Sequence, residues 1–129
     1  MTRDINKNVF DEATKLKLTI FGECFEEWLP VFNYASQTKG IYIFDFFAGS
    51  GKDLDNNPGS PLILLDKAKG KERKYCAKTK KEIKFIFNES ISKKSKELDE
   101  NVKQHIEKCK QENNCPDCVY DCRVWNDEF

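Results

Sequence analysis

The chain has 129 residues, of which 39% are apolar and 12% aromatic, and its formal net charge is zero. This composition supports one folded domain and argues against wholesale disorder. No stretch approaches the roughly 18 apolar residues that a membrane span needs, and the acidic N-terminal region lacks the basic end and apolar stretch of a secretory signal. We therefore expect a cytoplasmic protein whose six cysteines are reduced thiols or metal ligands rather than disulfides.

The net charge of zero conceals an uneven distribution along the chain. Residues 1–65 carry six basic and nine acidic side chains, residues 66–110 carry fifteen and eight, and residues 111–129 carry one and five. The middle segment is therefore the part of the chain to which a polyanion would bind.

The first expected element is an amphipathic helix over residues 11–29. Acids lead this segment and Pro30 follows it, which is typical of a helix that ends before the proline. The apolar residues that recur at helical spacing are Leu16, Ile20, Phe21, Cys24, Phe25, Trp28 and Leu29.

A nearly continuous run of apolar, β-forming residues, GIYIFDFF, begins at Gly40. Such a run predicts a strand that is buried on both faces and belongs to a parallel sheet. The loop that follows is rich in Gly, Asn, Asp and Pro and closes with Ser60 and Pro61. Serine at the N-cap and proline at the first helical position predict a helix start at this point.

Three further elements are expected after the lysine-rich stretch 67–84. They are a strand over 83–89, a polar helix over 92–112 and a third strand near the C-terminus. The apolar side of the helix consists of Leu98, Val102, Ile106 and Cys109, and in the third strand the residues that alternate with polar ones are Tyr120, Cys122 and Val124. The order β–α–β–α–β after a leading helix predicts an α/β protein with a partial Rossmann-like parallel sheet of about three strands and flanking helices.

The turn AGSGKD, directly after the first strand, resembles several nucleotide-binding loops. The Walker pattern needs a glycine where Phe46 stands and a hydroxyl residue where Asp53 stands. The dinucleotide fingerprint needs a third glycine in place of Leu54. Both patterns fail, which leaves an acid-x-Phe-Ala-Gly-x-Gly turn. Glycine lets such a backbone pass close to a ligand, and the strand-end carboxylate can hold a cationic or hydroxyl-bearing group.

This turn resembles the first motif of class I S-adenosylmethionine-dependent methyltransferases. The segments KLKLTIFGECFEEWLPVF, YIFDFFAGSGKD and PGSPLILL, in this order, are also similar to the three-Cys-motif partner proteins. That family is a bacterial group with a methyltransferase-like domain. The similarity covers roughly residues 14–66, whereas residues 83–129 resemble the family only in their pattern of expected elements.

The resemblance implies a pocket for S-adenosylmethionine. Asp45 would lie near the methionine portion and the glycine turn near the ribose. Glu89 would accept hydrogen bonds from the ribose hydroxyls, and Asp127, after the third strand, would contact the adenine amino group. The implied cofactor-binding residues are Asp45, Phe47, Ala48, Gly49, Gly51, Glu89 and Asp127.

The same resemblance implies an incomplete domain. Methyltransferases of this class have about seven strands, and their acceptor-site residues follow the fourth. Residues 1–36 would form an N-terminal helical region and residues 37–129 the N-terminal half of a methyltransferase-like domain, with no catalytic residue assigned. Such a chain would be an enzyme only when completed. A half sheet leaves its first strand with an open apolar edge, so we expect a second copy or a second polypeptide to complete the sheet.

Two other patterns leave alternatives open. Cys109, Cys115, Cys118 and Cys122 have the spacing C-x5-C-x2-C-x3-C, which is compatible with zinc, although cysteines on apolar faces are also ordinary core residues. Residues 67–84 include nine basic side chains among eighteen, which could bind nucleic acid through phosphates or form a solvated connection. The alternative to a cofactor-binding domain is thus a non-catalytic module that binds protein or nucleic acid.

Overall fold

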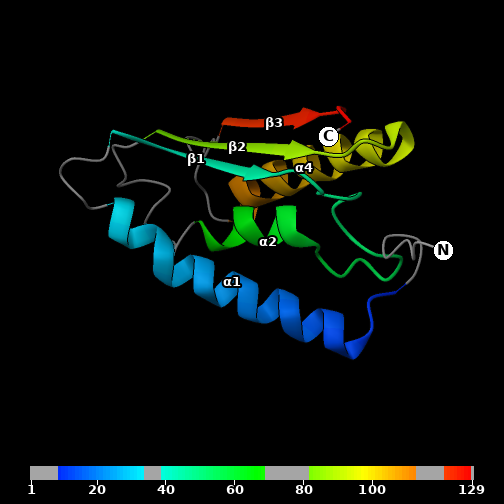
Figure 1. Ribbon diagram of the computed structural model, residues 1–129, viewed down its shortest axis with the longest axis horizontal. Helices are drawn as coiled ribbons and strands as arrows, with labels where there is room; N and C mark the ends of the chain where they lie inside the picture. Colours follow the sequence, from blue (N-terminus) through cyan, green and yellow to red (C-terminus); the bar gives the residue numbers. More distant parts are fainter. Residues whose placement is uncertain (1–8, 34–38, 69–81, 113–120, 129) are drawn as a thin grey trace.

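The three strands that the structure describes form one parallel sheet. The computed structural model describes residues 9–33, 39–68, 82–112 and 121–128 (Figure 1). Their elements, in chain order, are α1 (Glu12–Asn33), β1 (Gly40–Asp45), α2 (Ser60–Lys67), β2 (Glu82–Asn88), α4 (Ser92–Glu112) and β3 (Asp121–Trp125). The strand order is β1-β2-β3, with Ile43 opposite Phe85 and Phe85 opposite Cys122. The predicted α/β class with three parallel strands and flanking helices is confirmed.

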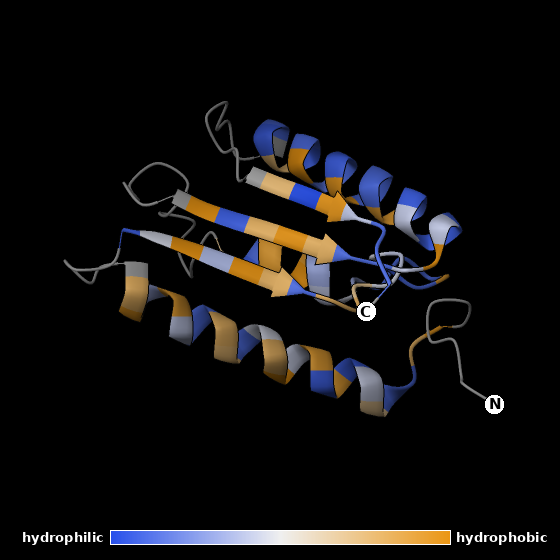
Figure 2. Ribbon diagram, turned by 45° about the horizontal axis from the view of Figure 1, so that its top comes forward, coloured by the Kyte–Doolittle hydropathy of each residue, from blue (hydrophilic) through white to orange (hydrophobic). Residues whose placement is uncertain are grey.

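The two crossover helices, α2 and α4, lie on one face of this sheet, and α1 lies on the same side but beyond the edge of β1 (Figures 1 and 2). The reason is the handedness of the connections. Both crossovers, β1 to β2 through α2 and β2 to β3 through α4, move in the same direction across the sheet. Right-handed crossovers that move in the same direction place their helices on the same face.

The core lies between the sheet and these helices. Its fully buried apolar side chains come from α1, α2, β2 and α4, and the largest are Phe85, Phe87, Leu29, Leu65 and Leu98. The predicted apolar side of α4 is confirmed, since Leu98, Val102 and Cys109 are buried and Ile106 is partly buried against the core. In β3, Cys122 and Val124 also pack against the core, as their alternation predicts.

The sequence predicts a first helix that ends before Pro30, but α1 continues through this proline to Asn33. Proline removes one backbone donor and its ring clashes with the preceding turn, at a cost of about 3 kcal/mol. The residues around it are held by packing that offsets this cost. Leu29 is fully buried, and the rings of Trp28 and Phe32 lie 4.7 Å apart on successive turns. None of the described helices is long and apolar enough to cross a membrane.

The predicted apolar side of α1 is only partly buried. Phe25 and Leu29 belong to the core, whereas the other five predicted residues are exposed: Leu16, Ile20, Phe21, Cys24 and Trp28. Figure 2 shows the reason, because α1 lies beyond the edge of β1 rather than behind the sheet. Much of its apolar surface therefore has no sheet to pack against.

The prediction that β1 is buried on both faces is wrong. Ile41 is buried, but Tyr42 is 57% exposed and Phe44 is 47% exposed. The uncovered face of the sheet explains this alternation, since the described helices pack only against the opposite face. On the uncovered face, the ammonium group of Lys84 lies 5.7 Å from the centre of the Tyr42 ring, which partly shields that ring by a cation–π contact.

Serine 60 is not the N-cap of α2. The N-cap is Gly59, and Ser60 is the first helical residue, with Pro61 buried behind it. The Ser60 hydroxyl donates instead to Oδ2 of Asp45, at the end of β1. The serine thus connects the strand to the helix rather than capping the helix backbone, and the predicted helix start is correct to within one residue.

Candidate functional site

The carboxyl ends of the three strands bring the predicted acids to one edge of the sheet. Asp45 is the last residue of β1, Glu89 directly follows β2, and Asp127 follows β3 by two residues. In a parallel sheet these ends lie side by side, and the crevice outside them is where open α/β sheets bind ligands. The parallel topology therefore places all three residues at the same edge of the sheet (Figure 1).

Glu89 connects the glycine turn to the end of β2. Its Oε2 accepts a hydrogen bond from the backbone N–H of Gly49 at 2.9 Å, and its Oε1 accepts one from Ile91 at 3.2 Å. The side chain is buried. Two predicted cofactor residues, 40 positions apart, are thus in direct contact, and each carboxylate oxygen retains one further lone pair for a ligand.

The turn itself depends on its two predicted glycines. Gly49 has a φ of +68° and Gly51 a φ of +99°, which side chains rarely adopt. A Cβ on Gly51 would also lie 3.3 Å from Cδ1 of Leu98. The backbone N–H of Gly59 donates to the Gly51 oxygen at 2.7 Å, which closes the loop back onto the turn. The backbone of Gly51 therefore lies close to helix α4 and to the Gly59 end of its own loop.

Alanine at Gly51 is expected to lower the free energy of unfolding by about 1.5 kcal/mol, because it combines a positive φ with contact against Leu98. Valine should cost more than alanine, since a β-branched residue is least tolerant of this backbone region. Urea denaturation followed by circular dichroism measures both variants. Equal stability of the wild type and both variants would contradict this account of the turn.

The other predicted residues of the turn face different environments. Ala48 is buried and its N–H donates to the backbone oxygen of Asn88 at 2.9 Å. Phe47 is 82% exposed, so its ring is accessible from solvent. Asp45 accepts from the Phe47 N–H at 3.3 Å as well as from Ser60. Asp127 is exposed, and the contacts that fix it to Asn88 use its backbone.

Two asparagines that the sequence analysis did not single out hold the strand ends together. Asn88, 1% exposed, donates through Nδ2 to the backbone oxygens of Phe46 at 3.3 Å and Asp127 at 2.9 Å, and its Oδ1 accepts from the Asp127 N–H at 2.9 Å. Asn126 donates to the backbone oxygens of Glu89 at 2.8 Å and Ser90 at 2.9 Å. An asparagine that ends a buried strand is the one available signal for such a role.

Asp53 is a further buried carboxylate that the sequence analysis did not assign to a site. It accepts hydrogen bonds from the N–H groups of Phe10, Asp55 and Asn57 and from the Asn57 side chain, at 2.7–2.9 Å. Burial by itself raises the pKa of Asp53, but these donors together outweigh it and hold the pKa below its ordinary value. The spacing Asp-x-x-x-Asn in a loop is the sequence signal for this turn.

The proposed zinc ligands are only partly within the described residues. Cys109 is buried on α4, and Cys122 is partly buried on β3. Cys115 and Cys118 lie outside the described residues, so the four-cysteine site stays a prediction. Among the residues that the structure describes, no group of three or more His, Cys, Asp or Glu side chains is arranged to hold a metal ion.

The basic stretch 67–84 also lies largely outside the described residues. At one end of the stretch, Nζ of Lys67 lies 3.8 Å from Oε2 of Glu26 on α1. At the other end, the ammonium group of Lys84 lies over the ring of Tyr42. Both described lysines thus contact the protein itself. Nucleic-acid binding by the rest of the stretch stays a prediction.

Comparison with protein-family models, with curated proteins and with solved structures finds no match to this chain. The functional interpretation therefore depends on the geometry of the strand ends and on the resemblance of its motifs.

Proposed function

We propose that this chain binds S-adenosylmethionine at the carboxyl ends of its three strands, as the cofactor-binding half of a Rossmann-like, class I methyltransferase-like domain of the three-Cys-motif partner type. The observation that carries the proposal is the hydrogen bond between the N–H of Gly49 and the Glu89 carboxylate. This hydrogen bond holds Glu89, which is expected to bind the ribose hydroxyls, against the glycine turn, which is expected to lie near the same ribose. Asp45 lies at the end of the adjacent strand.

The residues present are compatible with this cofactor. Glu89 and Asp45 each make two hydrogen bonds within the protein, yet carboxylate oxygens have about four lone-pair sites for ribose hydroxyls or an ammonium group. Asp127 and the ring of Phe47 are accessible at the same edge. The bound cofactor would supply an activated methyl group for an in-line displacement, a reaction that needs positioning more than acid–base help. No described residue is assigned to the methyl acceptor.

Calorimetric titration with S-adenosylhomocysteine tests the proposal. We expect micromolar binding by the wild type and a loss of about tenfold or more in Asp45→Ala and Glu89→Gln, which corresponds to at least about 1.4 kcal/mol each. Glu107→Ala, which removes an exposed acid from α4, is the matched control and should bind normally. Thermal melts show whether each variant is folded. Absence of binding by a folded wild-type chain would contradict the proposal.

One observation favours a second function. β1 is at the edge of the described sheet, with a groove of about 650 Å³ between this edge and α1. This supports the alternative of a protein-interaction module, either in place of cofactor binding or beside it. Titration with S-adenosylhomocysteine separates the two functions, because strand-edge binding needs no cofactor.

A further inference from the structure

Asn126 connects the end of β3 to the short segment, residues 89–92, that leads from β2 into α4. Its Nδ2 donates to the backbone oxygens of Glu89 at 2.8 Å and Ser90 at 2.9 Å. Its Oδ1 accepts a hydrogen bond from the Ser92 hydroxyl at 3.1 Å. A single side chain thus holds both ends of this connection against β3.

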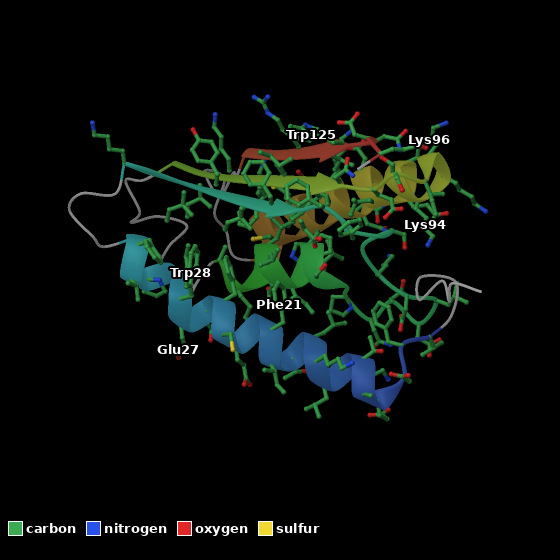
Figure 3. The ribbon with its side chains drawn as sticks, viewed as in Figure 1. Phe21, Glu27, Trp28, Lys94, Lys96 and Trp125 are labelled. Atoms are coloured by element: carbon green, nitrogen blue, oxygen red, sulfur yellow. The ribbon has the colours of Figure 1, made fainter. Side chains whose placement is uncertain are left out.

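Backbone contacts bring the same elements together. The Glu89 N–H donates to the backbone oxygen of Trp125 at 3.1 Å, and the Ser95 hydroxyl donates to the same oxygen at 3.5 Å. Figure 3 shows this junction, with the end of β3 marked by Trp125 and the first turn of α4 marked by Lys94. The side chain of Asn126 therefore adds three hydrogen bonds to elements that already lie side by side.

Glu89 is fixed through its backbone by β3 and through its side chain by the glycine turn. Its backbone oxygen accepts from Asn126, and its carboxylate accepts from the N–H groups of Gly49 at 2.9 Å and Ile91 at 3.2 Å. The side chain is also buried. Because the carboxylate is attached to the connection that Asn126 holds, release of the connection moves the carboxylate relative to the turn.

The exposure of Asn126 separates this role from folding. Asn88, the other asparagine at the strand ends, is 1% exposed, whereas Asn126 is exposed. Water can replace hydrogen bonds that are lost at an exposed site, so their net contribution to folding is small. Three hydrogen bonds from one exposed side chain to one connection are therefore better explained by the position that they give to Glu89.

We propose that Asn126 is a positioning residue for a bound nucleoside and acts through Glu89. It holds residues 89–92 so that the Glu89 carboxylate stays against the glycine turn, and it thereby determines how strongly the site prefers a ribose that has both hydroxyls. A site built to bind a hydroxyl group discriminates against an analogue that lacks it. This role of Asn126 rests on the proposed function, in which Glu89 accepts hydrogen bonds from the ribose hydroxyls.

Amide hydrogen exchange of the ligand-free protein, followed by NMR, tests the first step. The N–H groups of Gly49 and Ile91 donate to the Glu89 carboxylate, so they report whether it stays in place. In Asn126→Ala their exchange is expected to be at least about fivefold faster, which corresponds to the net contribution of one hydrogen bond. The N–H of Ala48, which donates to the end of β2, is the internal control and should change less than about twofold.

Calorimetric titration with adenosine and with 2′,3′-dideoxyadenosine tests the second step. The wild type is expected to bind adenosine at least about tenfold more tightly, because only adenosine offers hydroxyls to Glu89. Asn126→Ala should weaken the binding of adenosine about fivefold and that of dideoxyadenosine less than about twofold, so that most of the preference is lost. A role of Asn126 in folding alone would weaken both ligands by the same factor.

Two further variants complete the comparison. Glu128→Ala removes an exposed side chain two positions further along the chain and should match the wild type in both measurements. Asn126→Asp keeps the shape of the side chain but turns a carboxylate oxygen toward two backbone oxygens, so it should have at least the effect of Asn126→Ala. Thermal melts show whether each variant is folded. If Asn126→Ala does not fold, Asn126→Asp with Glu128→Ala as control gives the same comparison.

Two results would overturn this role of Asn126 and leave the proposed function intact. They are unchanged exchange at Gly49 and Ile91 in the folded variant, and an equal preference for adenosine in the variant and the wild type. A folded wild type that binds neither adenosine nor S-adenosylhomocysteine would contradict the proposed function itself. Asn126 would then be a structural residue only, whatever its effect on hydrogen exchange.

Discussion

Replacement of Asn88 by alanine is expected to lower the free energy of unfolding by about 3 kcal/mol, although no ligand contact is assigned to this residue. The side chain is 1% exposed and makes three hydrogen bonds, two as donor and one as acceptor. Each contributes about 1 kcal/mol net, and truncation leaves the backbone groups of Phe46 and Asp127 without that partner. Urea denaturation at neutral pH measures the loss.

Two further variants test whether the amide group itself is the cause. Asn88→Asp keeps the shape and the acceptor but replaces the donor with a carboxylate oxygen that faces two carbonyl oxygens, so it should cost at least as much as alanine. Asn126→Ala removes an exposed asparagine that also bonds the strand end and should cost about 1 kcal/mol. A wild-type-like Asn88→Asp would refute the donor role.

The order of elements could be predicted from the sequence because local patterns determine it. The apolar spacing of Leu98, Val102 and Cys109 has only one helical solution, and the buried face of α4 is the predicted one. The parallel topology in turn predicts that strand-end acids gather at one edge. The contact of Glu89 with Gly49 across 40 residues is a consequence of that topology.

The exposure of β1 and α1 could not be predicted in the same way. A continuous apolar run such as GIYIFDFF indicates that a strand is compatible with burial, not that something covers it. Whether Tyr42 and Phe44 are buried depends on how many strands the sheet has and on which of its faces the helices cover. The same limit applies to α1, whose Phe21 and Trp28 are 41% and 43% exposed because the helix lies beyond the edge of the described sheet.

The hydrogen-bonded residues were missed for a different reason. Asn88 and Asp53 have partners that lie far away in the sequence, such as Asp127 for the first and Phe10 for the second. A strand-end asparagine and a loop aspartate are common, and only the fold shows which backbone donors they meet. Polar residues of this kind are therefore the part of the site that sequence patterns describe least well.

The two proposed binding surfaces meet at Asp45. This residue is implied in cofactor binding, accepts a hydrogen bond from Ser60 and also lines the groove beside β1. A strand added along residues 40–45 would end next to the glycine turn.

Replacement of Asp53 by asparagine is expected to cost about 2.5 kcal/mol at pH 7 and much less in acid. Burial raises the pKa of Asp53, but the N–H groups of Phe10, Asn57 and Asp55 and the Asn57 side chain lower it further, to below its ordinary value. Because the folded pKa is the lower one, the carboxylate contributes its full stability above the unfolded value of about 3.9. That contribution is lost as the pH falls through the folded pKa.

Urea denaturation of the wild type and Asp53→Asn between pH 7 and pH 2.5 measures this dependence. The two stabilities should begin to converge below about pH 4 and meet below the folded pKa of Asp53, because the protonated wild type no longer has the charge that the variant lacks. Asp55→Asn removes the same charge from an exposed side chain two residues away and should stay within about 0.5 kcal/mol of the wild type at each pH. A constant gap between the wild type and Asp53→Asn would mean that the loop is stabilised by shape and not by the buried charge.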